Sequence, residues 1–142
     1  MQIRATRNGD SDQLVELLSE LGYDITREAL SAQLERYQDS EHSFALVAHE
    51  GEHAVGLIGG HLIPLLHQSG NAGRITAFIV SGSVRGSGVG TQLLTDLEAI
   101  FLQNNCLRIE VTSGDHRVEA HEFYKSKGYV PDERRFIKNI FA

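Results

Sequence analysis

Apolar residues change their spacing several times along the chain, and these changes predict the order of helices and strands. A short apolar and polar alternation over residues 3–6 predicts a first strand. Two helices follow: the first starts at the turn of residues 8–11 and ends at Gly22, and the second is capped by Thr26. Their apolar positions recur at helical spacing, at Leu14, Val15, Leu17, Leu18 and Leu21 and then at Leu30, Leu34 and Tyr37.

The middle of the chain predicts a hairpin, a further strand and a long helix. Residues 44–49 and 54–63 read as two strands joined by the short turn Glu50-Gly51-Glu52. The second of them carries Gly56, Gly59 and Gly60, which would let another backbone or a ligand come close. Residues 74–80 predict the next strand. The amphipathic helix after it ends near Asn104 and is marked by Leu93, Leu94, Leu97, Ile100 and Phe101.

The last third of the chain predicts a strand, a helix and two more strands. Residues 107–112 are mostly apolar, which is typical of the centre of a sheet. Residues 118–127 predict a short helix that stops at Gly128, and residues 129–131 and 135–140 predict two closing strands. Strand–helix–strand order implies parallel neighbours and the hairpins imply antiparallel ones, so the predicted fold is one α/β domain over residues 1–142 with a mixed sheet.

Composition narrows the class of protein. The chain has 142 residues and a formal net charge of -6, so it lacks the excess of basic residues that non-specific nucleic-acid binding requires. Its single cysteine excludes an internal disulfide and a multi-cysteine zinc site, and we expect no metal. No apolar run approaches the length of a membrane span, and the first residues have no apolar signal core. We therefore expect a cytoplasmic protein that binds neither nucleic acid nor membrane.

A glycine-rich loop lies between the strand at 74–80 and the long helix, with the sequence Val84-Arg85-Gly86-Ser87-Gly88-Val89-Gly90. The first N–H groups of a helix have no partner in the helix, and the helix dipole adds partial positive charge there. The glycines remove side chains that would hold an anion away, and Arg85 adds a cation. The loop predicts a diphosphate site; the plainer interpretation is a turn that only leads into the helix.

Two other phosphate-binding motifs are alternative interpretations of this loop. A Walker-type loop ends in Gly-Lys-Ser/Thr, but Gly90 is followed by Thr91 and Gln92, which excludes it. A dinucleotide fingerprint follows the first strand of a βαβ unit, whereas this loop follows about the fourth predicted strand. Glu110 lies twenty residues beyond Gly90, at the spacing of the ribose-binding acid of that fingerprint, which keeps this alternative open.

Two stretches together carry a resemblance to a known family. The loop with its flanks, residues 79–94, resembles the acetyl-CoA-binding motif of the GNAT superfamily of N-acetyltransferases. The stretch Ala120-His121-Glu122-Phe123-Tyr124, followed by Gly128 and Tyr129, resembles the second signature of that superfamily. The resemblance implies a GNAT fold, a single mixed, mostly antiparallel sheet of six to seven strands flanked by about four helices. It further implies acetyl-CoA as cosubstrate and direct transfer of the acetyl group to a primary amine of a small molecule. Because many members of the superfamily dimerise, we also expect a homodimer.

The same resemblance assigns roles to particular residues. It places an oxyanion donor at the backbone N–H of Val80 and a general acid at Tyr124. Arg117 stands where the family often has an asparagine against the pantetheine arm, so whether it meets the cofactor or the acceptor stays open. The implied cofactor contacts are Phe78, Ile79, Val80, Arg85, Gly86, Ser87, Gly88, Val89, Gly90, Thr91, Ser113, Arg117, His121 and Tyr124.

The proton acceptor and the amine are less determined. Some family members use a glutamate on the strand before the loop, but residues 74–80 contain no carboxylate. The candidates that remain are a water chain or one of His61, His67, His116 and Glu110. For substrate binding we expect His61, His67, Arg74 and His116.

Residues 55–62 and the run from His116 to Tyr124 resemble aminoalkylphosphonate N-acetyltransferases. The cations available to a phosphonate are Arg74, Arg117, Arg135, His61 and His67. Aminoglycosides, polyamines, amino acids and protein N-termini or lysines are alternative acceptors. The alternative from another class is a non-catalytic acyl-CoA sensor or a partner-binding module on the same fold, and Tyr124 argues against it.

Overall fold

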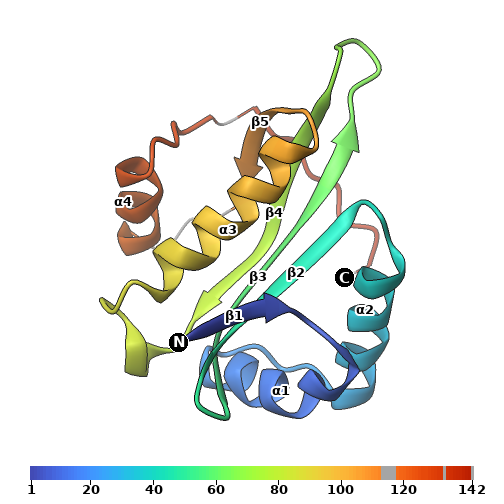
Figure 1. Cartoon of the computed structure of the whole chain (residues 1–142). Helices are drawn as coiled ribbons and strands as arrows, with labels where there is room; N and C mark the ends of the chain where they lie inside the picture. Colours follow the sequence, from blue (N-terminus) through green and yellow to red (C-terminus); the bar gives the residue numbers. More distant parts are fainter. Residues whose placement is uncertain (113–117, 133, 142) are drawn as a thin grey trace. The chain divides into compact units, whose positions relative to one another are not determined.

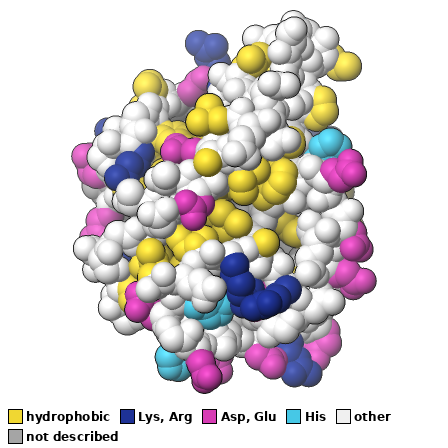
Figure 2. Space-filling view, in the orientation of Figure 1, with side chains coloured by type: hydrophobic (Ala, Val, Ile, Leu, Met, Phe, Trp, Pro, Cys, Tyr) yellow, Lys and Arg dark blue, Asp and Glu magenta, His cyan; other side chains and the backbone are white. Residues whose placement is uncertain are grey.

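The computed structural model describes residues 1–112, 118–132 and 134–141. The chain divides into two compact units, residues 1–112 and 113–142, and each is described by itself. In the described residues no helix is both long enough and apolar enough to cross a membrane. On the face seen in Figure 2, acidic side chains are scattered and basic ones gather in small separate groups.

The first unit is built on one five-stranded sheet in the order β1-β2-β3-β4-β5 (Figure 1). The first three pairings are antiparallel and β4 pairs with β5 in parallel, as expected where a helix connects two strands. The mixed sheet is therefore as predicted. The strands are β1 Gln2–Ala5, β2 Ser43–Glu50, β3 His53–Pro64, β4 Asn71–Val80 and β5 Cys106–Val111.

Helices cover both faces of this sheet. Helices α1 (Ser11–Glu20) and α2 (Arg27–Asp39) bury their leucines against β2, β3 and β4, with Leu14 fully buried. Helix α3 (Val89–Gln103) buries Phe101 and three leucines on the other face. Adjacent residues of β3 identify the two faces, since a Cβ on Gly59 would meet Tyr37 of α2 and one on Gly60 would meet Phe101 of α3.

Glycines let α3 lie close to the sheet. A Cβ on Gly73 would lie 2.7 Å from the ring of Phe101, and one on Gly56 would lie 2.8 Å from Leu93. The glycines of β3 predicted a close approach of another backbone or a ligand. A close approach is confirmed, and helix α3 of the same chain makes it. Phe101 is 0% exposed and fills this space.

Helix ends follow local signals. The Thr26 hydroxyl accepts from the N–H of Ala29 at 3.1 Å and caps α2, as predicted. In the second unit, α4 (Val118–Ser126) ends before Gly128, which has φ +92. The N–H of Tyr129 donates to the carbonyl of Tyr124 at 3.0 Å, and that of Gly128 to Lys125 at 3.1 Å, which satisfies the last carbonyls of the helix.

Two expectations about the sheet are wrong. The described residues among 129–131 and 135–140 form no strands, so the sheet of the described chain has five strands where six to seven were predicted. Pro131 has no N–H to give to a ladder, and Phe136 is fully exposed, so its apolar side chain covers no core. In consequence β5 is an edge strand and not a central one, and Leu107 on it is 54% exposed.

Candidate active site at the open end of strand β4

Strand β4 has a closed half and an open half. Its pairing with β5 runs only from Asn71 to Ile75, and the N–H of Thr112 closes it with a bond to the carbonyl of Ile75 at 3.4 Å. From Ala77 to Val80, β4 pairs with β3 alone among the described residues, and the last pair is Gly56 with Val80. We call residues 71–75 the closed half and residues 76–80 the open half.

A β-bulge marks the change between the two halves. Gly59 pairs with Ala77 and Gly60 with Ile75, so Thr76 is an extra residue in β4. A bulge bends its strand and increases the local twist. The bulge therefore lies at the boundary between the closed and the open half of β4.

The backbone N–H of Val80 lies on the unpaired edge. Ser81 donates its N–H to the carbonyl of Val55 in β3 at 2.8 Å. Because backbone groups of successive strand residues point to opposite edges, the N–H of Val80 points away from β3. That edge has no β5 partner in the described chain, so the N–H of Val80 has no β5 carbonyl to donate to.

The glycine-rich loop follows directly, and the first N–H groups of the helix after it have no acceptor within that helix. Gly86 and Gly88 have φ +82 and +91, and a Cβ on either would meet nothing within 4 Å. The first bond of α3 runs from the N–H of Gln92 to Gly88 at 3.0 Å. The N–H groups of residues 89–91 therefore have no acceptor within the helix, and Gly88 has no side chain to cap them. With the exposed Arg85 beside them, these donors suit a diphosphate.

His61 is held by hydroxyl groups on the face that α2 covers. Its Nδ1 lies 3.0 Å from Ser43 Oγ, and its Nε2 lies 3.1 Å from the Tyr37 hydroxyl and 3.0 Å from Thr76 Oγ1. Burial lowers the pKa of the imidazole, so His61 is neutral near pH 7. Thr76 is four residues from Val80, about 13 Å along the strand at about 3.3 Å per residue.

Arg74 and Glu110 form an ion pair in the closed half. Glu110 Oε1 accepts from Arg74 Nη2 at 2.6 Å, and its Oε2 accepts from Arg108 Nε at 2.7 Å. These bonds from Arg74 and Arg108 hold the pKa of the Glu110 carboxyl below its ordinary value, against the opposing effect of burial. Arg74 pairs with His61 on β3 and with Glu110 on β5, so three of the predicted residues lie in one row across the sheet.

His67 is not brought near the open half. It lies in the β3–β4 hairpin, beyond the pair of Pro64 and Asn71. Asn71 is nine residues before Val80, about 30 Å at about 3.3 Å per residue. Figure 1 shows this hairpin at the opposite end of β4 from the start of α3.

The second unit carries Tyr124 on α4. Its ring centroid lies 5.7 Å from that of Phe123 and 5.8 Å from that of Tyr129, both in edge-to-face contacts. Tyr124 is half-buried and His121 is exposed. The predicted residues Ser113, His116 and Arg117 lie outside the described residues.

The structure also brings together two residues that sequence reasoning missed. The Ser81 hydroxyl donates to Glu20 Oε1 at 2.8 Å, and its Oγ lies 3.1 Å from Oε2. The two residues are 61 positions apart, so no local pattern predicts the contact. The one signal in the sequence that could have indicated this contact is Glu20 itself. It is an acid at the C-terminal end of α1, where the helix dipole favours a cation.

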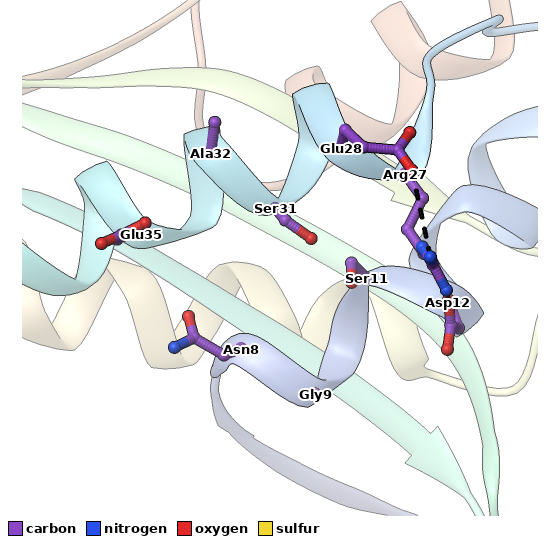
Figure 3. Close-up of a pocket in the computed structure, with 9 residues that line it drawn as sticks. All are labelled: Asn8, Gly9, Ser11, Asp12, Arg27, Glu28, Ser31, Ala32 and Glu35. Atoms are coloured by element: carbon purple, nitrogen blue, oxygen red, sulfur yellow. Dashed lines mark hydrogen bonds and ion pairs between the residues drawn. The ribbon is translucent and has the colours of Figure 1, made fainter.

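A polar groove lies elsewhere, between the starts of α1 and α2 (Figure 3). It has a volume of about 570 Å³, and Arg27 crosses it to bond Asp12 at 3.1 Å. Its α1 residues are in the first turn, whereas Glu20 ends that helix, about 12 Å further on at about 1.5 Å per residue. The groove is therefore separate from the open half of β4. No cluster of three metal-binding side chains occurs among the described residues.

Comparisons with known proteins agree on the family. The model of the acetyltransferase (GNAT) family matches residues 11–129. An aminoalkylphosphonate N-acetyltransferase from Salmonella typhimurium is 30% identical over 98% of this chain and 91% of its own length. A GNAT acetyltransferase structure from Staphylococcus aureus is 26% identical, with a TM-score of 0.80 over 98% of both chains.

An aminoglycoside 6'-N-acetyltransferase from Acinetobacter haemolyticus shares the fold at 18% identity, with a TM-score of 0.80 over 99% of this chain and 100% of that one. The matches cover nearly the whole chain, and the matched residues include the open half of β4, the glycine-rich loop and α4. The chain belongs to the GNAT family of N-acetyltransferases.

Proposed function

We propose that the protein transfers an acetyl group from acetyl-CoA directly to a primary amine of a small molecule. Family membership implies an acyl-CoA cosubstrate. The observation that carries the proposal is the continuity of one segment. The open edge of β4 ends at Val80, and the N–H groups of residues 89–91, which have no acceptor within the helix, begin nine residues later. A thioester and a diphosphate joined by a pantetheine arm need such donors at two separated places.

In this proposal the cofactor lies along the open half and ends at the loop. The diphosphate takes the N–H groups at the start of α3 and the charge of Arg85. The pantetheine amides run beside residues 78–80, in the place that a longer β5 would occupy. The remaining contacts that the resemblance implies, among them Ser87, Ser113, Arg117 and His121, are part of the proposal.

The proposed chemistry has three steps. A neutral amine attacks the thioester carbonyl carbon, and the oxyanion that forms accepts from the N–H of Val80. The C–S bond then breaks and the electron pair leaves on sulfur, which takes a proton from the Tyr124 hydroxyl. The amide nitrogen gives up its extra proton to a base or to water, and Tyr124 is reprotonated from solvent.

The two candidate bases on the sheet differ in their ability to accept a proton from the amine. Glu110 bonds two guanidinium groups and its pKa is lowered, so its carboxylate is a poor proton acceptor. His61 is neutral and can accept a proton, but about 13 Å of strand separates Thr76, its partner, from Val80. We propose that the proton leaves through water, with His61 as an acceptor at the end of that path.

For the acceptor we propose an aminoalkylphosphonate. The support is the relative from Salmonella typhimurium, which carries that activity in its name and matches nearly the full chain. Aminoglycosides, polyamines, amino acids and protein amines are the competing acceptors.

The acceptor is tested with a panel of amines and with free CoA read by a thiol reagent. We expect release of CoA with aminoalkylphosphonates above that with aminoglycosides, polyamines, amino acids and peptides. Activity with other amines alone would end the phosphonate proposal. Binding of acetyl-CoA without release of CoA from any amine would favour a sensor instead.

The role of Tyr124 is tested by Tyr124→Phe. Loss of a general acid should lower kcat by about 100-fold, with the dissociation constant of CoA unchanged. Tyr129→Phe is the matched control, because it removes a hydroxyl from the neighbouring ring of the same cluster. Equal turnover of Tyr124→Phe and wild type would remove Tyr124 from the mechanism.

A further inference from the structure

Ser81 lies at the junction between the two parts of the proposed site. It follows Val80 directly and precedes the 3-10 turn Gly82–Val84 that leads into the glycine-rich loop. The residue is 5% exposed. A change in its position would therefore move the end of β4 and the start of the loop together.

Ser81 is bonded on every side. Its N–H donates to Val55 of β3 at 2.8 Å, and its carbonyl accepts from the N–H of Val84 at 3.2 Å. Its hydroxyl donates to Glu20 at 2.8 Å, while its Oγ lies 2.9 Å from Ser83 Oγ and accepts from the N–H of Ser83 at 3.3 Å. With one proton given and both acceptor positions used, this hydroxyl has no capacity left to relay a proton from a substrate.

Helix stability does not explain Glu20. It is the last residue of α1, and that last turn has no basic residue to pair with it. The C-terminal end of a helix carries partial negative charge, so a carboxylate is unfavourable there. Its carboxylate instead bonds Ser81, 61 positions further along the chain.

We propose that Glu20 is a positioning residue, which acts through Ser81 to hold the Val80 N–H and the glycine-rich loop in one fixed relation. This inference rests on the proposed function, because it takes Val80 and the loop as the two ends of the acetyl-CoA site. The cofactor must reach both ends at once. A loose junction would therefore weaken CoA binding and slow acetyl transfer, since a small displacement of a positioned group lowers rate.

The test compares five variants by two measurements. Titration calorimetry gives the dissociation constant of CoA without any acceptor, and steady-state kinetics give kcat and KM for acetyl-CoA. We expect Glu20→Ala and Ser81→Ala each to weaken CoA binding and to lower kcat/KM about tenfold, as for loss of a charged hydrogen bond. Their double variant should be no worse than either one alone, because both remove the same bond.

Two further variants separate positioning from other roles. Glu20→Gln keeps an oxygen that accepts from Ser81, so it should stay within about threefold of wild type. Glu16→Ala removes an exposed acid one turn earlier on α1 and should change neither measurement. A thermal melt of each variant shows that it folds.

Three outcomes would overturn the inference. If Glu20→Ala kept the CoA affinity and turnover of wild type, the bond from Ser81 to Glu20 would position neither Val80 nor the glycine-rich loop for the reaction. Glu20 would be a base if Glu20→Gln were as slow as Glu20→Ala, if its CoA affinity were unchanged, and if one limb of the pH profile of kcat were lost. A wild-type chain that binds no CoA would end the proposed function, and this inference with it.

Discussion

The two halves of strand β4 share one neighbour and differ in the other. Both pair with β3, but only residues 71–75 pair with β5 as well. In the closed half, Gly73 lies against the ring of Phe101, and Arg74 bonds Glu110 across to β5. In the open half, Val80 has a backbone edge that no described residue of β5 covers.

The difference shows how one strand can serve both fold and function. A closed ladder satisfies its own N–H and C=O groups and has nothing left for a ligand. An open edge keeps these groups for a partner, and here its backbone is held from one side by β3 and Ser81. The bulge at Thr76 separates the two conditions within one strand.

The largest effect should come from removing the buried side chain that packs against the closed half. Phe101→Ala removes a fully buried ring that packs on Gly73 and near Gly60, so we expect the free energy of unfolding to fall by about 3–5 kcal/mol. Denaturant unfolding measures it. Leu102→Ala, next along α3 and 72% exposed, is the control and should change little. A loss under about 1 kcal/mol for Phe101→Ala would mean that the closed half is not the rigid part.

A smaller effect should appear in binding when the loop is strained. Gly88 has φ +91, where an L side chain costs about 1–2 kcal/mol, so Gly88→Ala should weaken CoA binding about tenfold. Titration calorimetry gives the value. Gly51→Ala adds similar strain at φ +59 in the β2–β3 turn and should lower stability without changing CoA affinity. Equal CoA binding by both variants would remove the loop from the proposed site.

The smallest effect concerns the ion pair of the closed half. Glu110→Gln should lower the free energy of unfolding by at most about 1 kcal/mol at pH 7, because Glu110 and Arg74 are partly exposed. The folded pKa of Glu110 is depressed, so its contribution is present above the unfolded value of about 4.3 and is lost as pH falls through the folded pKa. Unfolding curves of both proteins should therefore converge in acid.

The same variant sharpens the comparison in activity. If Glu110 belongs only to the closed half, Glu110→Gln should keep the kcat of wild type across the neutral range. A kcat lowered by 100-fold or more, with the unfolding curve unchanged, would instead make Glu110 the proton acceptor.

Local patterns predicted most of the elements. Leucines at helical spacing gave α1 and α3 their positions, Thr26 was recognised as a cap, and Gly128 as a stop. The two closing strands were predicted wrongly, because an apolar alternation by itself does not show that another strand pairs with it. Phe136 is fully exposed, and the alternation around it forms no ladder.

The candidate site was predictable only in part. The loop from Arg85 to Gly90 was visible because glycines and a following helix are signals between near neighbours in the chain. The distance of His67 from Val80 depends on strand register, which places the hairpin and the open half at opposite ends of β4. The contact of Glu20 with Ser81 joins residues 61 positions apart.

The sequence by itself determined most of the helices and strands, the cap of α2 and the glycine-rich loop, because each depends on interactions over a few residues. The tertiary structure decided where β4 stops pairing with β5, which edge the N–H of Val80 faces, and that Glu20 meets Ser81. These features depend on how the sheet twists and on how α1 packs against it. No spacing along the sequence records either one.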